Sequence, residues 1–122
     1  MPHLIVEYTP NLAGFAADDI LAALNDTLIA SGEIANETDL KARAVPVETF
    51  RIGNQPAQRA FVHAQLRLLA GRTPEAKRAL SDRIAAVLRE RVPRPTGVLV
   101  QLSAEIVDMD RDAYSKEKLP AA

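Results

Sequence analysis

Residues 59–76 read RAFVHAQLRLLAGRTPEA and contain a strand, a turn and the start of a helix. The apolar residues that run up to Leu69 predict a β-strand, and the Gly71-Arg72 pair marks the turn that follows it. Thr73, Pro74 and Glu75 predict a helix start, because they supply a capping hydroxyl, a proline at the first helical position and an acid in the first turn.

This stretch opens the second of two similar segments. The first segment runs from residue 2 to about residue 47 and the second from residue 59 to about residue 107, and each reads as strand, helix, strand. Apolar spacings of three and four residues give each predicted helix one apolar stripe, formed by Ile20, Leu21, Leu24 and Leu28 in the first and by Leu80, Ile84, Val87 and Leu88 in the second. A connection of this length predicts a parallel strand pair within each segment, with right-handed crossover.

Two such units can share one sheet. We therefore expect a single α+β domain over residues 1–122: duplicated β-α-β units form a four-stranded mixed sheet with two helices on one face, in two layers. Residues 51–58 are expected to be a linker, and the polar tail 108–122 to be either solvated or an arm over a neighbouring subunit. The uncovered face predicts oligomerisation, because we expect it to hold apolar strand residues, namely Leu66, Leu68, Leu69, Val98, Val100, Leu102 and Ile106.

Composition narrows the class of protein. The 122 residues are 48% hydrophobic and contain no cysteine, which excludes disulfides, thiol nucleophiles and zinc–thiolate sites. A formal net charge of −1 with few aromatic residues argues against a nucleic-acid partner. The sequence has no apolar run long enough for a membrane span, and we expect a cytoplasmic protein.

Pro2 is the strongest single candidate for chemistry. A methionine before a small residue is normally removed, and removal of Met1 would leave the proline nitrogen as a free secondary amine. Residues 3–8, HLIVEY, read as a strand that would hold this amine on a rigid element. The sequence therefore predicts a base at the start of the chain, provided that Met1 is absent.

Four stretches together resemble a known group of enzymes. They are Pro2–Glu7, Lys41–Val45, Phe61–Ala64 and Ala70–Glu75, and they stand within the duplicated layout described above. The chain resembles the tautomerase superfamily, and within it is most like the 5-carboxymethyl-2-hydroxymuconate isomerases. The resemblance extends from Pro2 to about residue 106.

The resemblance implies a cofactor-independent isomerase of aromatic-compound breakdown that forms a homo-oligomer, expected to be a trimer. Pro2 would move a proton within a small dienol di- or tricarboxylate. The usual pKa of an α-amino group is about 7.7–8.0, and an apolar pocket with arginines nearby would lower it, so that the amine could accept a proton at neutral pH and later return it.

The same resemblance implies roles for two further residues, and the position of Phe50 near the end of its predicted strand suggests a third. Arg72, at the strand-to-helix turn, would bind a substrate carboxylate through its planar guanidinium, and Arg43 would bind or polarise the oxygenated end of the substrate. Phe50 would form an apolar wall of the pocket, although core packing explains it equally well. His3 and His63 lack a third ligand, so packing or hydrogen bonding is favoured over a metal site, and no metal is expected.

Two alternative functions remain open on the sequence. One is a different tautomerase that acts on phenylpyruvate-like enols, for which fewer cationic anchors would be needed. The other is a trimeric binding or signalling protein of the same fold without turnover.

Overall fold

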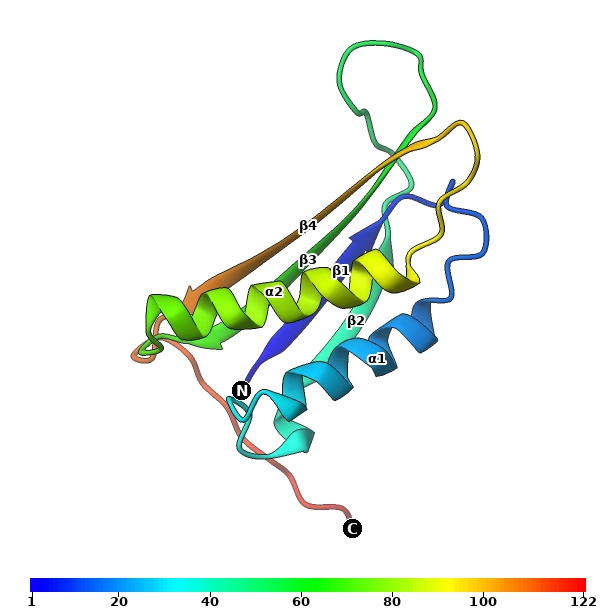
Figure 1. Ribbon diagram of the computed structural model, residues 1–122. Helices are drawn as coiled ribbons and strands as arrows, with labels where there is room; N and C mark the ends of the chain where they lie inside the picture. The colour runs from blue at the N-terminus through cyan, green and yellow to red at the C-terminus, as the bar shows by residue number, and fades with distance from the viewer.

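Two layers make up the computed structural model, which describes all residues from Met1 to Ala122. A four-stranded sheet forms one layer, and two helices lie over one of its faces (Figure 1). In chain order the elements are β1 (His3–Tyr8), α1 (Ala17–Ala30), the short 3-10 turn η1 (Glu37–Asp39), β2 (Lys41–Pro46), β3 (Arg59–Leu69), α2 (Pro74–Arg91) and β4 (Leu99–Met109).

The sheet has the mixed topology that two joined β-α-β units produce. Its strand order is β2-β1-β3-β4, in which β1 runs parallel to β2, β3 runs parallel to β4, and the two inner strands pair antiparallel. The predicted fold class is therefore confirmed. The start of α2 and the end of α1 also follow from their residues: the Thr73 hydroxyl accepts from the Ala76 amide at 3.1 Å, and Gly32 has a positive φ of 82° just after α1.

The core lies between the helices and the two inner strands. On β1 and β3 every second side chain faces the helices and is at most 1% exposed, namely Leu4, Val6, Ala60, Val62, Ala64, Leu66 and Leu68. The opposing helix positions are spaced four residues apart, at Ile20, Leu24 and Leu28 on α1 and at Leu80, Ile84 and Leu88 on α2. The matching of these two periods fixes which face of the sheet is covered.

The sequence-based expectation for the uncovered face is wrong for all of its residues except Leu69, which alternation places opposite Leu68. Leu66 and Leu68 lie on the covered face, and β4 follows the same alternation because Val62 pairs with Leu102. Val98, Val100 and Ile106 likewise pack against the core. Side chains alternate strictly along a strand, so a count of apolar residues does not tell which face holds them.

The uncovered face of the sheet is largely polar. Its side chains from the two inner strands and β4 include His3, Ile5, Glu7, His63, Gln65, Arg67, Ser103 and Glu105, as their register positions require. The His63 ring bonds to the Ser103 hydroxyl at 2.7 Å and to a Glu105 carboxylate oxygen at 2.6 Å. Any partner on this face would therefore meet hydrogen-bonding groups as well as scattered apolar side chains such as Ile5, Val45 and Leu99.

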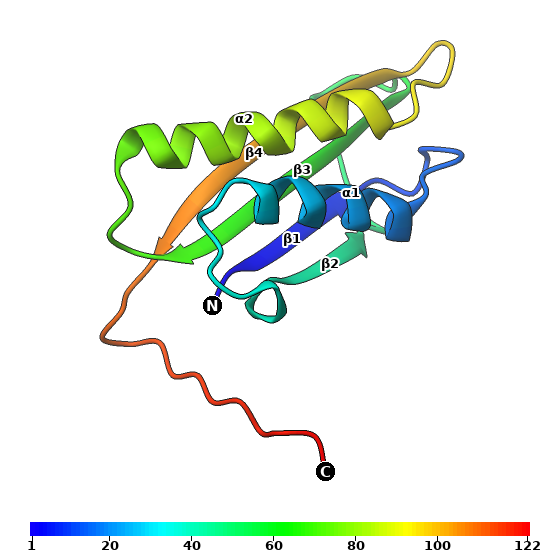
Figure 2. The same cartoon turned by 60° about the horizontal axis from the view of Figure 1, so that its bottom comes forward.

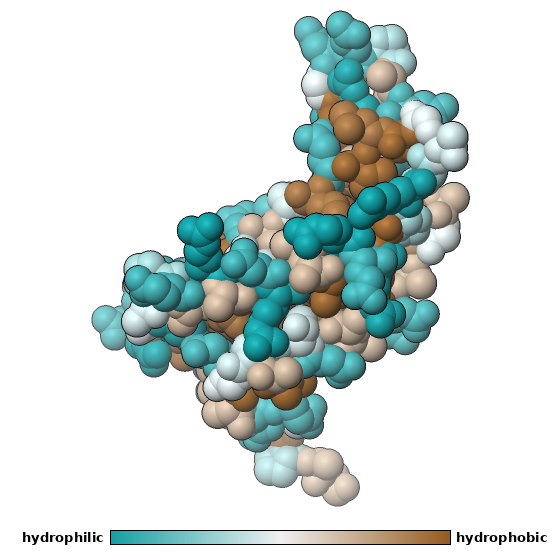
Figure 3. All heavy atoms as spheres, in the orientation of Figure 1, coloured by the Kyte–Doolittle hydropathy of each residue, from teal (hydrophilic) through white to brown (hydrophobic).

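Exposed apolar surface is found instead near the start of the edge strand β4. A hollow of about 260 Å³ there is lined by Val92, Arg94, Val98, Val100 and Leu102. Figure 3 shows an apolar patch in this region of the molecule. Neither helix combines the length and the apolar character that a membrane crossing requires.

Replacement of Leu24 by alanine tests the position of the core. Leu24 is fully buried between the layers, and we expect Leu24→Ala to lower the free energy of unfolding by about 2–5 kcal/mol in urea denaturation. The same change at Leu119, which is 83% exposed, should alter it by less than about 0.5 kcal/mol. Equal effects of the two changes would contradict this arrangement of the layers.

Candidate active site

A cavity of about 210 Å³ lies at the start of β1. Pro2 is buried at its wall, and the cavity is lined by Met1, Pro2, Glu33, Ile34, Ala35, Asp39, Leu68, Leu69, Arg72 and Arg111. Five parts of the chain meet here: the amino terminus, the loop after α1, the end of β3, the turn before α2 and the residues that follow β4. The structure thus brings together two of the predicted site residues, Pro2 and Arg72.

Arg72 is held in place by three hydrogen bonds. Its Nε donates to Glu33 Oε1 at 3.0 Å, its Nη1 to the Leu69 carbonyl at 3.1 Å and its Nη2 to the Glu33 carbonyl at 2.9 Å. The side chain is only 23% exposed. A guanidinium has five N–H donors, so Arg72 is fixed in orientation and still has two N–H groups for a ligand.

Cationic groups surround the chain terminus. The Met1 amino group lies 3.8 Å from Asp39 Oδ2 and donates to the Asp39 carbonyl at 3.4 Å. Burial, followed by the charge of Lys41, lowers the pKa of this amino group from 8.0 to about 6, although Asp39 acts in the opposite direction. Burial also lowers the pKa of the Lys41 ammonium, whose Nζ donates to the Asp39 carbonyl at 2.6 Å.

The polar tail packs against its own amino terminus. Tyr114 Oη lies 2.9 Å from Nε2 of His3, while Lys116 and Lys118 reach Asp39 Oδ1 at 2.6 and 2.8 Å. These two lysines hold the pKa of the Asp39 carboxyl well below its usual range. Figure 2 shows the tail leaving the sheet after β4 in extended form. Part of the tail therefore lies against the amino-terminal region of its own chain.

The structure places Arg43 outside the cavity. Arg43 is exposed on β2 opposite Ile5, and its Nη1 lies 3.2 Å from Nδ1 of His3. Its side chain therefore belongs to the uncovered face of the sheet, one strand away from β1. The two histidines both make hydrogen bonds, and no cluster of three or more potential metal ligands is present.

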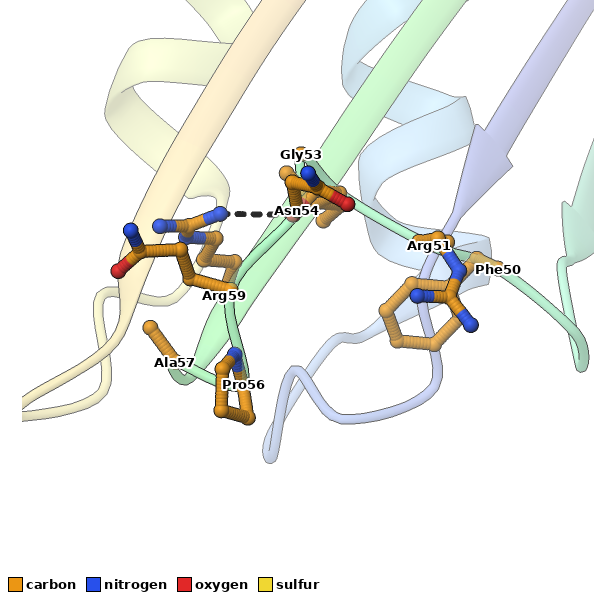
Figure 4. Close-up of a pocket in the computed structure, with 9 residues that line it drawn as sticks. Phe50, Arg51, Gly53, Asn54, Pro56, Ala57 and Arg59 are labelled. Atoms are coloured by element: carbon orange, nitrogen blue, oxygen red, sulfur yellow. Dashed lines mark hydrogen bonds between the residues drawn. The ribbon is translucent and has the colours of Figure 1, made fainter.

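Phe50 lies in a different cavity, at the other end of the sheet. This hollow, of about 310 Å³, is lined by Phe50, Arg51, Ile52, Gly53, Asn54, Gln55, Pro56, Ala57 and Arg59, and Arg59 Nη1 donates to the Ile52 carbonyl across it at 2.8 Å (Figure 4). The Phe50 ring meets Phe61 edge to face, with centroids 6.3 Å apart. Since Phe61 pairs with Thr9 just beyond β1, whereas Pro2 precedes β1, the length of that strand, roughly 20 Å, separates them.

Sequence reasoning missed the groups that set the electrostatics of the cavity. The position of Lys41 could have been predicted, because Lys41 is the first residue of the strand that pairs in parallel with β1 and lies opposite His3. The positions of Asp39 and Arg111 could not have been predicted, because a 3-10 turn and the first residues of a tail give no periodic pattern. Only the folded chain shows that both reach the cavity of Pro2.

Comparison with known proteins agrees with this geometry. The family model for 5-carboxymethyl-2-hydroxymuconate isomerase matches residues 2–119. The chain belongs to this family. It shares 30% identity with a 5-carboxymethyl-2-hydroxymuconate isomerase from Deinococcus radiodurans R1, with a TM-score of 0.85 over 97% of this chain and 90% of that one. The chain is accordingly an isomerase.

Other solved structures share the tautomerase fold at lower identity. A 5-carboxymethyl-2-hydroxymuconate delta-isomerase is 17% identical, with a TM-score of 0.75 over 97% of this chain and 88% of that one. A fused 4-OT protein, described as a symmetric trimer, is 24% identical, with a TM-score of 0.61 over 90% of this chain and 87% of that one. No curated protein sequence matches the chain.

The electrostatics of the amino terminus can be tested at Lys41. In the chain that retains Met1, we expect the α-amino group to titrate near pH 6 and Lys41→Gln to raise its pKa, because a neighbouring cation disfavours the protonated amine. The pH dependence of acylation of the terminal peptide, followed by mass spectrometry, measures this pKa. Lys77→Gln is the matched control, since Lys77 pairs with Asp108 on α2 and β4. An unchanged pKa in Lys41→Gln would contradict the assigned cause.

Proposed function

We propose that the chain, after removal of Met1, uses the Pro2 nitrogen to move a proton within a small dienol di- or tricarboxylate, as part of aromatic-compound breakdown. The observation that carries this proposal is that Pro2 is buried at the wall of a cavity that also holds Arg72. Burial and neighbouring cations lower the pKa of the Met1 amino group. The same surroundings would lower the pKa of the Pro2 amine once Met1 is removed.

The reaction balances with one group as base and acid. The neutral proline amine takes the proton of the dienol hydroxyl, and the electron pair of that O–H bond forms the carbonyl while the conjugated double bonds shift along the chain. The terminal double bond then takes the proton back from the proline ammonium at its remote carbon. The product is the conjugated ketone, the amine is regenerated, and no oxidant, metal or cofactor enters the balance.

Arg72 supports the reaction by binding a carboxylate. Glu33 and two backbone carbonyls orient its guanidinium, and the two remaining N–H groups can donate to an anion in the cavity. A fixed arginine keeps its charge throughout the proton transfer. It therefore positions the substrate without competing for the proton.

The cationic surroundings favour a polycarboxylate over a phenylpyruvate-like enol. Around the cavity stand Lys41, Arg72, Arg111, Lys116 and Lys118, opposed by the carboxylates of Glu33 and Asp39. A ligand with one carboxylate would leave much of this positive charge without a counterpart. A ligand with two or three carboxylates matches it better.

Phe50 and Arg43 would join this site from a neighbouring copy in a trimer. Within one chain Phe50 lies a strand length from Pro2, and Arg43 points to the uncovered face. A fold relative described as a symmetric trimer supports the assembly. Phe50 would reach the site if the far end of one sheet met the start of β1 in the next copy, and Arg43 would reach it if the uncovered face of one sheet lay against that neighbour.

Replacement of Pro2 tests the base. Intact mass should show that Met1 is absent from active material, and Pro2→Ala should lower kcat at least about 100-fold because a general acid–base group is lost. Ultraviolet absorbance follows the dienol, and deuterium uptake at carbon in deuterated water shows the proton route. Pro10→Ala, at an exposed turn, serves as control. Full turnover by protein that retains Met1 would overturn the role of Pro2.

Subunit mixing tests the shared site. Pro2→Ala and Phe50→Ala chains, each impaired alone, should regain about a quarter of the wild-type activity when refolded together, because some neighbouring pairs then contain both native residues. Mixing Pro2→Ala with Arg72→Gln is the matched control and should restore nothing, since both residues line one chain's cavity. No recovery in the first mixture would show that Phe50 does not serve a neighbour.

A further inference from the structure

A second arginine, Arg111, lines the cavity of Pro2 and has no part in the reaction described above. It lies two residues after the end of β4, at the beginning of the polar tail. Like Arg72, it places a guanidinium at the cavity, although the two residues are far apart in the sequence. The contacts of the Arg111 guanidinium show which of its N–H groups can bind a ligand.

Backbone contacts fix the position of Arg111. The Ala70 amide donates to the Met109 carbonyl at 2.9 Å, which ties the end of β4 to the turn before α2. Arg111 Nε then donates to the Ala70 carbonyl. Its Nη2 lies so close to Gly71 that a Cβ at that position would be 3.4 Å away. The guanidinium is therefore held over the Gly71 backbone, next to Arg72.

The two arginines differ in their free donors. Three N–H groups of Arg72 are bonded within the protein, and Glu33 balances its charge. Neither Nη of Arg111 has a partner, and no carboxylate is within ion-pairing distance of it. The flanking Asp110 accepts from the Asp112 amide instead. Arg111 thus presents the complete two-nitrogen edge that binds a carboxylate in bidentate fashion.

The other tail cations do not offer such an edge. Lys116 and Lys118 both bind Asp39, so their charges are already used to hold the tail against the amino terminus. Lys41 donates to the Asp39 carbonyl. Among the cations around the cavity, Arg111 is the one whose donors are least occupied by the protein.

We propose that Arg111 binds a second carboxylate of the ligand while Arg72 binds the first, so that the cavity selects small dicarboxylates over monocarboxylates. This rests on the proposed function for its substrate but concerns binding alone. The cavity of about 210 Å³ suits a ligand smaller than a drug-sized molecule. Arg111 contributes to affinity and specificity and has no part in the proton transfer.

Calorimetric binding of two unreactive acids of equal length tests this selection. Adipate carries two carboxylates and hexanoate carries one. Arg111→Gln should weaken adipate binding about tenfold, the loss expected for a charge-assisted contact that solvent partly screens, and leave hexanoate unchanged. Arg111→Lys should restore part of the affinity, because it keeps the charge but loses the bidentate edge. Arg78→Gln, an exposed arginine on α2, is the control for net charge.

Kinetics separate this inference from the proposed reaction. With a dienol dicarboxylate, Arg111→Gln should raise KM about tenfold at unchanged kcat. Unaltered adipate binding and KM in an active Arg111→Gln enzyme would overturn the role of Arg111 and leave the isomerase proposal standing. An equal loss of adipate and hexanoate binding would also overturn it. Weakened adipate binding in a protein that turns over no dienol would uphold the carboxylate site and overturn the proposed reaction.

Discussion

Hydrogen bonding along both edges of β1 is the constraint on which the rest of the structure depends. Chain termini usually fray, but here the first strand is paired in parallel with β2 and antiparallel with β3 from His3 onward, and the Lys41 amide donates to the Pro2 carbonyl at 3.1 Å. The start of the chain therefore sits in the middle of the sheet. A group at this position has the rigidity that acid–base chemistry requires.

Opposed charges set the state of the terminal amine. Burial and the charge of Lys41 disfavour the protonated form of this amine, whereas Asp39 favours it. The effect of burial and Lys41 is the larger, so the pKa of the amine is lowered. Lys116 and Lys118 form ion pairs with Asp39 and partly neutralise its negative charge. The tail thereby acts on the amine in two ways: the charges of Lys116 and Lys118 themselves lower its pKa, and both lysines partly neutralise the carboxylate that raises it.

Much of the fold could be predicted from local sequence patterns. Which strand residues lie on which face of the sheet could not. The Thr73-Pro74-Glu75 start, the helix stripes and the repeat each depend on neighbouring residues and are confirmed. The placement of Leu66 on the uncovered face was wrong, because facing is decided by pairing between strands. For the site, the sequence indicated Pro2 and Arg72, which share a cavity. It did not indicate Arg111, whose approach depends on where β4 ends.

The two halves of the sheet are unequal in length. β1 and β2 have 6 residues each, whereas β3 and β4 have 11. The end of β3 therefore extends past the start of β1, where Leu68 and Leu69 line the cavity. A perfectly symmetrical duplication would leave the terminal proline at an open rim. The longer second unit encloses it, although its own first strand is internal and has no free amine. The two halves of the duplicated layout therefore contribute differently to one cavity: the first places the start of the chain in it, and the second supplies part of the wall around that start.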